Sequence, residues 1–180
     1  MRRRAFIAGL GSSAAWPLVA SAQDSAMPVV AYVSLGSPDS MVGRLDAFRK
    51  GLAEMGYAEG RNVQVEYHWL EGQYEHLDAV LGDLIQRQIA VIAIPGGTPI
   101  SLAAKSATNS IPIVFGVAED PVRLGLVTSL AHPGGNATGF NFFAIEAETK
   151  RFGVMHDLLP KATRIAVLVN PSNPRYTATG

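Results

Sequence analysis

The order of apolar runs and helical stripes along this chain predicts a parallel α/β sheet. Two continuous apolar runs, residues 90–94 and 112–117, flank a glycine-proline turn and a short helix expected over residues 100–108. Strands covered by helices on both faces have no solvent face to alternate toward, so such runs are typical of a βαβ unit. We therefore predict a doubly wound α/β core.

The segments around this unit continue the same pattern. Strands are expected over residues 29–35 and 137–143, and also over residues 62–69, where one-sided alternation favours an edge position. Helix-spaced apolar stripes predict three further helices, over residues 41–55, 74–87 and 144–159, and the stripe of the first is expected to pack on the sheet. Asp120 and Pro121 suit the start of a short helix that reaches Leu130.

A last apolar run, residues 163–169, is expected to form a buried strand that opens a second α/β lobe. It follows Pro160, and the loop after it contains Asn170 and is similar in character to the loop after the first strand. We expect residues 23–160 to form an N-terminal lobe. Residues 161–180 would be the start of a second lobe that is largely missing.

The first 22 residues have the features of an export signal. Arginines at positions 2–4 precede a mildly apolar stretch, residues 5–20, and a small-x-small site predicts cleavage after Ala22. The pair Arg3-Arg4 resembles a twin-arginine signal, and the ordinary secretory route stays open as an alternative. The apolar stretch is too short to span a bilayer, so we expect a soluble periplasmic protein with no stable membrane insertion after cleavage.

Composition and charge narrow the possible partners. The 180 residues are 48% hydrophobic and 17% charged, with fifteen basic and fifteen acidic side chains. Removal of the signal takes away three arginines and no acidic residue, which leaves a net charge of −3, and no basic stripe is present. We therefore expect no nucleic-acid partner. The absence of cysteine excludes disulfides, thiolate metal sites and thiol nucleophiles.

Motifs for cofactors, metals and catalysis are weak or missing. A match to the dinucleotide fingerprint, residues 9–14, lies inside the expected signal. The histidines at positions 68, 76, 132 and 156 lie in four different segments without the spacing of a metal site. No G-x-S-x-G elbow occurs. We expect no cofactor, no metal and no enzymatic activity.

The ends of the predicted strands indicate where a ligand would bind. In a doubly wound sheet, ligands occupy the crevice beyond the carboxyl ends of the strands. Gly97 and Thr98 offer backbone N–H groups and a hydroxyl at a helix N-terminus, which favours anions, although a tight turn alone would use the same residues. Glu119 and Asp120 follow the next strand, where Asp120 would either cap a helix or hold a ligand ammonium group.

A set of segments spread over the chain carries a resemblance to a known family. It comprises residues 1–7, 15–18, 48–57, 66–72, 111–115, 120–122 and 129–139. In combination these segments resemble the ABC-transporter substrate-binding proteins of the tryptophan/tyrosine-binding type.

The resemblance implies the fold of type I periplasmic binding proteins. In such proteins two doubly wound, Rossmann-like lobes close over a small solute, which is then delivered to an ABC permease in the inner membrane. It implies a ligand-binding site in the loops described above, with these residues: Ser37, Gly97, Thr98, Asp120 and Asn170. Because closure between two lobes buries the ligand, a largely missing second lobe implies a truncated form.

We therefore predict the periplasmic solute-binding component of an ABC transporter, in truncated form, that binds a small amino-acid-like or polar solute. Two alternatives stay open. One is a sensory ligand-binding module that feeds a signalling receptor, and the other is an exported α/β enzyme whose catalytic half is missing. A permease and an ATPase encoded beside this chain would favour transport, whereas a kinase would favour sensing.

Overall fold

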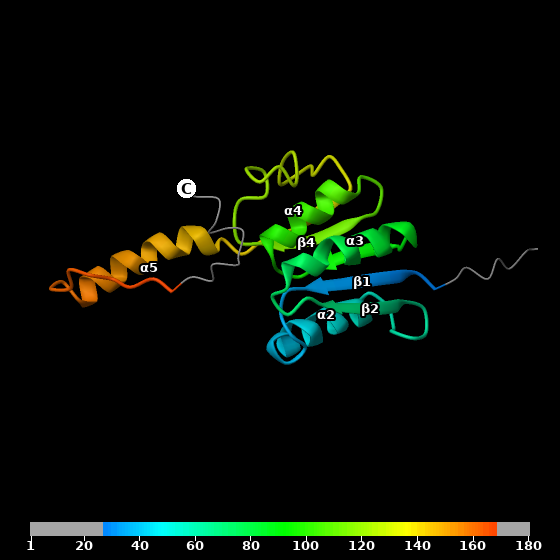
Figure 1. Cartoon of the computed structure of the whole chain (residues 1–180), viewed down its shortest axis with the longest axis horizontal. Coiled ribbons are helices and arrows are strands. Elements are labelled where there is room, and N and C mark those ends of the chain that lie inside the picture. The colour runs from blue at the N-terminus through cyan, green and yellow to red at the C-terminus, as the bar shows by residue number, and fades with distance from the viewer. Residues whose placement is uncertain (1–26, 169–180) are drawn as a thin grey trace, which may run out of the picture.

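The computed structural model describes residues 27–168, in which five strands form a parallel sheet (Figure 1). In chain order the strands are β1 (Val29–Ser34), β2 (Gln64–Trp69), β3 (Val91–Ile94), β4 (Ile113–Val117) and β5 (Ala137–Asn141). Their order in the sheet is β2-β1-β3-β4-β5, and each neighbouring pair is parallel. This arrangement confirms the predicted α/β fold class, with β2 at an edge.

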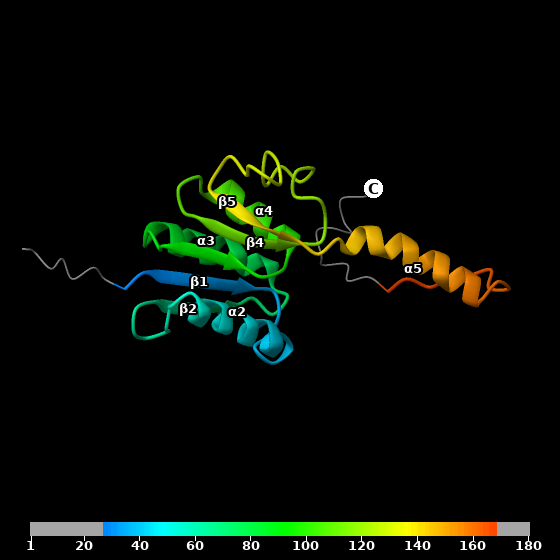
Figure 2. The same cartoon turned by 180° about the vertical axis from the view of Figure 1, so that it is seen from behind.

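Helical segments connect the strands or follow the last of them. They are η1 (Asp39–Met41), α2 (Val42–Glu54), η2 (Tyr74–His76), α3 (Leu77–Gln86), α4 (Thr98–Ala107) and α5 (Ala144–Leu158). Helices α3 and α4 lie together over the sheet, whereas α5 projects beyond its end (Figures 1 and 2). Phe143, directly before α5, has a left-handed backbone with φ 52° and ψ 32°.

The main core lies between the sheet and helices α3 and α4. Leu77, Leu81 and Leu84 are buried and fall on one face of α3, as their spacing predicts. They pack with apolar residues of α4 and of the central strands: Ile100, Ala104, Ile92, Ile94, Ile113, Phe115 and Val117. The predicted helix over residues 74–87 is therefore confirmed, with a short 3-10 turn at its start.

Helix α2 covers the opposite face of the sheet over β1 and β2. There Tyr32 is fully buried, with its ring 5.2 Å from that of Phe48, 5.8 Å from that of Tyr67 and 5.4 Å from that of Trp69. No residue of α2 is itself buried. The apolar stripe predicted over residues 41–55 therefore packs on the sheet only in part.

The part of this face formed by β3, β4 and β5 is apolar and open. A hollow of ≈ 440 Å³ lies between it and α2, lined on the sheet side by residues such as Val91, Val114 and Phe140. Val114 is 41% exposed and Phe140 is 51% exposed. Among the described residues, no helix covers these side chains as α3 and α4 cover the other face.

Two predicted elements are wrong. The helix expected from Asp120 to Leu130 is a series of turns, since Gly125, with φ 72°, ends it after one turn. The strand expected over residues 163–169 is not formed in its described part, residues 163–168, which pairs with no strand and exposes 66% of Val167. Apolar patterning alone makes no strand when no neighbouring strand supplies hydrogen-bond partners.

The expected export signal, residues 1–22, lies outside the described residues, and so do Val169 and Asn170. Within the described range, none of the helices combines the length and the apolar character that crossing a bilayer requires.

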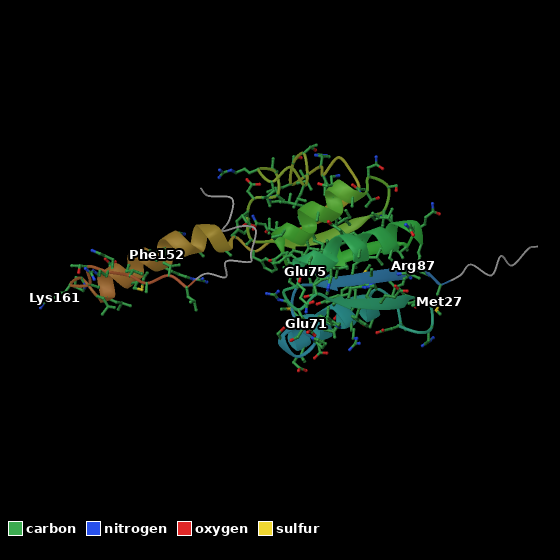
Figure 3. The ribbon with its side chains drawn as sticks, viewed as in Figure 1. Met27, Glu71, Glu75, Arg87, Phe152 and Lys161 are labelled. Carbon is green, nitrogen blue, oxygen red and sulfur yellow. The ribbon has the colours of Figure 1, made fainter. Side chains whose placement is uncertain are left out.

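An ion pair connects the edge strand β2 to helix α3. Arg87 follows α3 and lies on the side of the molecule where Met27 enters β1 (Figure 3). Its Nη1 donates to Oε1 of Glu66 at 3.0 Å and its Nη2 donates to Oε2 at 2.7 Å. This pairing lowers the pKa of the Glu66 carboxyl below its ordinary value of 4.5, against a smaller opposing effect of burial.

We expect Glu66→Gln to lower the urea midpoint of unfolding at neutral pH. Because the folded-state pKa of Glu66 lies below its unfolded value, the ion pair stabilises the fold above about pH 4.5. This stabilisation is lost as the pH falls through the lower, folded-state pKa. The midpoints of wild type and variant should therefore differ at about pH 7 and converge at about pH 3.

Glu54→Gln is the matched control, because Glu54 pairs with Lys50 at 3.8 Å on a highly exposed surface. Exposed pairs of this kind contribute little, so its midpoint should stay close to that of the wild type. A Glu66→Gln effect of the same size at both pH values would contradict the prediction.

Candidate functional site

Loops that follow four of the parallel strands meet around one pocket at the carboxyl edge of the sheet. Its volume is ≈ 540 Å³. The loops after β1, β3, β4 and β5 contribute to the lining together with α2, η2 and α5. The lining residues are Leu35, Arg44, Tyr74, Gly96, Gly97, Thr98, Pro99, Ala118, Glu119, Phe142, Ala144, Ala147 and Arg151. The pocket therefore lies at the edge where the sequence predicted a ligand site.

The turn between β3 and α4 brings main-chain donors to the pocket. Gly97 has φ 131° and caps α4, and no side chain caps the helix there. The buried Ser101 donates its Oγ hydrogen to the Gly97 carbonyl at 3.0 Å, which holds the turn from inside. Because the first N–H groups of a helix lack intrahelical acceptors, the turn is a favourable position for a negatively charged group.

A hydrogen bond joins the two central loops. Thr98 donates its Oγ1 hydrogen to Oε2 of Glu119, so the carboxylate after β4 is tied to the first residue of α4. Both residues line the pocket and are half-buried. The arrangement places one negative charge on this wall at a fixed position.

Two arginines bring positive charge to the same pocket. Arg44 reaches in from α2, and its guanidinium carbon lies 5.7 Å from the centre of the Phe142 ring. Arg151 lines the pocket from α5. Neither arginine forms a salt bridge with a carboxylate of the described residues. The described lining therefore carries two positive side chains and one negative side chain.

Tyr74 adds a hydroxyl group from η2 to the pocket lining. Partial burial raises the pKa of this phenol above its ordinary value. The hydroxyl is therefore protonated at neutral pH and is able both to donate and to accept a hydrogen bond.

Of the predicted site residues that the structure describes, two line the pocket and two lie outside its lining. Gly97 and Thr98 line the pocket. Ser37 lies in the loop after β1 but outside the lining, and its Oγ donates to Oγ of Ser40 at 3.2 Å. Asp120 also lies outside the lining, because its Oδ1 accepts from the backbone N–H groups of Val122 and Arg123 at 2.8 and 3.4 Å.

The sequence prediction missed the polar side chains that helices bring to the lining: Arg44, Tyr74 and Arg151. They do not directly follow a strand. The sequence does contain a signal that could have predicted Arg44 as a pocket residue. Arg44 lies in the first turn of the helix after β1, and that end of the helix faces the carboxyl edge of the sheet. Across residues 27–168, no group of three or more metal-ligating side chains occurs.

The comparison with protein families gives the class of this protein. Residues 27–178 match the family described as ABC transporter substrate binding protein. The chain therefore belongs to the ABC transporter substrate-binding protein family.

Individual relatives agree with this assignment. A tyrosine-binding protein from Clostridioides difficile (strain R20291) is 32% identical over 127 residues, which are 69% of this chain and 35% of that protein. The structure of a conserved domain protein from Vibrio cholerae matches with a TM-score of 0.68 and 27% identity, over 84% of this chain and 51% of that one.

A third similar protein was solved with a ligand. It is an ABC domain from Streptococcus pneumonia in complex with L-Trp, with a TM-score of 0.57 and 25% identity over 63% of this chain and 38% of that one. The matches to these relatives thus cover about half of their length or less.

The turn at Gly97 gives a test of the pocket geometry. We expect Gly97→Ala to lower the free energy of unfolding by about 1 to 3 kcal/mol, because a side chain is strained at this positive φ. The new Cβ would also lie 3.3 Å from Cδ1 of Ile100. Urea denaturation measures the difference.

Gly51→Ala is the control, because Gly51 lies within α2 with open space around it. Alanine is favoured over glycine inside a helix, so this variant should gain up to about 1 kcal/mol. Equal stability of the two variants would show that the turn tolerates a side chain.

Proposed function

We propose that this chain is the periplasmic solute-binding component of an ABC transporter and that it binds a small amino-acid-like solute. The observation that carries the proposal is the meeting of four strand-end loops around one pocket that contains both signs of charge. Arg44 and Arg151 suit a carboxylate, and Glu119 suits an ammonium group. An α-amino acid carries both groups on the same carbon atom.

The size and lining of the pocket support a small solute. Its volume of ≈ 540 Å³ falls within the range of about 300 to 1,000 Å³ that is usual for ligand pockets. Phe142 and the Tyr74 ring provide apolar surface for a side chain, and the Tyr74 hydroxyl provides a polar contact. The names of two relatives, one for tyrosine binding and one for a complex with L-Trp, support an aromatic amino acid.

The expected export signal at residues 1–22 supports delivery to the periplasm. There the protein would present its solute to a permease in the inner membrane. The loops with Ser37, Gly97, Thr98 and Asp120, and the segment with Asn170, form the proposed contact region. Of these residues, Gly97 and Thr98 already line the described pocket.

Thermal unfolding of the purified chain with a panel of solutes tests this function. A ligand at one hundred times its Kd adds about 2.7 kcal/mol to the free energy of unfolding. An amino acid that binds should therefore raise the Tm by several degrees. Sugars and nucleosides serve as controls, and a Tm rise with these compounds but with no amino acid would contradict the proposal.

Substitutions in the two central loops test whether they contact the solute. Thr98→Ala removes the hydroxyl that positions Glu119 and should weaken amino-acid binding by about 5- to 10-fold in isothermal titration calorimetry. Asp120→Asn removes a charge but keeps an oxygen that can accept from the Val122 N–H group. It should weaken binding without a fall in Tm, if the Asp120 carboxylate attracts the ammonium group.

Unchanged affinity in both variants would remove these loops from the site. Ser129→Ala, in the turn before β5 and outside the pocket lining, is the control that should bind as the wild type does.

A further inference from the structure

We propose that Arg44 binds the carboxylate of the solute and thereby restricts the pocket to ligands that carry a carboxylate group. The proposal rests on the proposed function, since it names the residue that selects the ligand class at the same site. It concerns a side chain of α2, outside the strand-end loops on which the sequence prediction concentrated.

The position of the guanidinium group is the first argument. Nη1 of Arg44 lies 2.8 Å from the point that a Cβ on Gly96 would occupy. The guanidinium therefore lies directly against the turn that leads into α4. Both the guanidinium and this turn line the pocket, so a carboxylate placed between them would meet a positive side chain and the donors at the start of a ten-residue helix.

The lack of a salt-bridge partner among the described residues is the second argument. The five nitrogen-bound hydrogens of an arginine suit a carboxylate in a two-point contact. Four arginine or lysine salt bridges in the described residues use Arg49, Lys50 and Arg87, but none uses Arg44. Nη1 of Arg44 donates a weak hydrogen bond to Sδ of Met41 at 3.9 Å, and the guanidinium has no carboxylate acceptor among the described residues.

Phe142 supplies the third argument, because it holds the guanidinium in place. The guanidinium carbon lies 5.7 Å from the ring centre, within the range of a cation–π contact. A planar group that lies over an aromatic ring loses less freedom when it binds a ligand than a free side chain would. Gly96 contributes by having no side chain, since a Cβ there would displace Nη1.

The experiment compares amino acids with the corresponding amines, which lack only the carboxylate. L-tyrosine with tyramine and L-tryptophan with tryptamine are titrated into the purified full chain by isothermal titration calorimetry. In the wild type, the amino acids should bind more tightly than the amines. Arg44→Gln should weaken binding of the amino acids by about 10- to 100-fold and leave binding of the amines unchanged, because a charge-assisted contact to the carboxylate is lost.

Three more variants complete the test. Gly96→Ala should weaken binding of the amino acids and leave binding of the amines unchanged, because the new Cβ displaces the same guanidinium. Arg61→Gln removes an exposed arginine before β2, at the amino edge of the sheet, and should change neither set of affinities. Arg44→Lys keeps the charge but loses the two-point contact. Its affinity for the amino acids should therefore lie between that of the wild type and that of Arg44→Gln.

Three results would overturn the role of Arg44. These are equal wild-type affinity for amino acids and amines, unchanged amino-acid affinity in Arg44→Gln, or an equal loss for both ligand classes in that variant, which would indicate a structural role. If the wild type binds neither aromatic amino acid nor any other amino acid of the thermal panel, the proposed function itself fails and this inference fails with it.

Discussion

Parallel pairing of the strands is the constraint on which the rest of the molecule depends. Because β1, β3, β4 and β5 run in one direction, their carboxyl ends reach the same edge, and the loops after them are brought together. The register depends on close packing between β4 and β5, where a side chain on Gly139 would collide with the carbonyl oxygen of Phe115. A shift in this pairing would move Phe142 and α5 away from the other loops.

Most of the fold could be predicted from the sequence because its elements are determined by local patterns. The leucines of α3 repeat at helical spacing and are buried, and the alternation in β2 correctly indicated an edge strand. The two failures have separate causes. The turn at residues 120–125 stops at Gly125, a residue inside the predicted helix, whereas residues 163–168 lack a neighbouring strand.

The candidate site could be predicted only where topology alone decides position. Gly97 and Thr98 line the pocket because any residue after a central parallel strand must lie at that edge. Arg44 and Arg151 lie on helices, and whether their long side chains reach the pocket depends on how each helix is oriented. Asp120 follows a strand as predicted, but its carboxylate binds the backbone of its own turn.

The pocket walls come from the sheet loops and from α5, and Phe143, whose backbone is left-handed, lies between these two parts of the chain. Its N–H group donates to Oδ1 of Asn141 at 2.6 Å, so the chain is held at the end of β5 and changes direction immediately afterwards. The walls formed by the sheet loops are fixed by the core, whereas Ala144, Ala147 and Arg151 belong to a helix joined through this one junction. The φ and ψ angles of Phe143 therefore set the direction in which α5 leaves the sheet, and with it the position of Arg151 in the pocket wall.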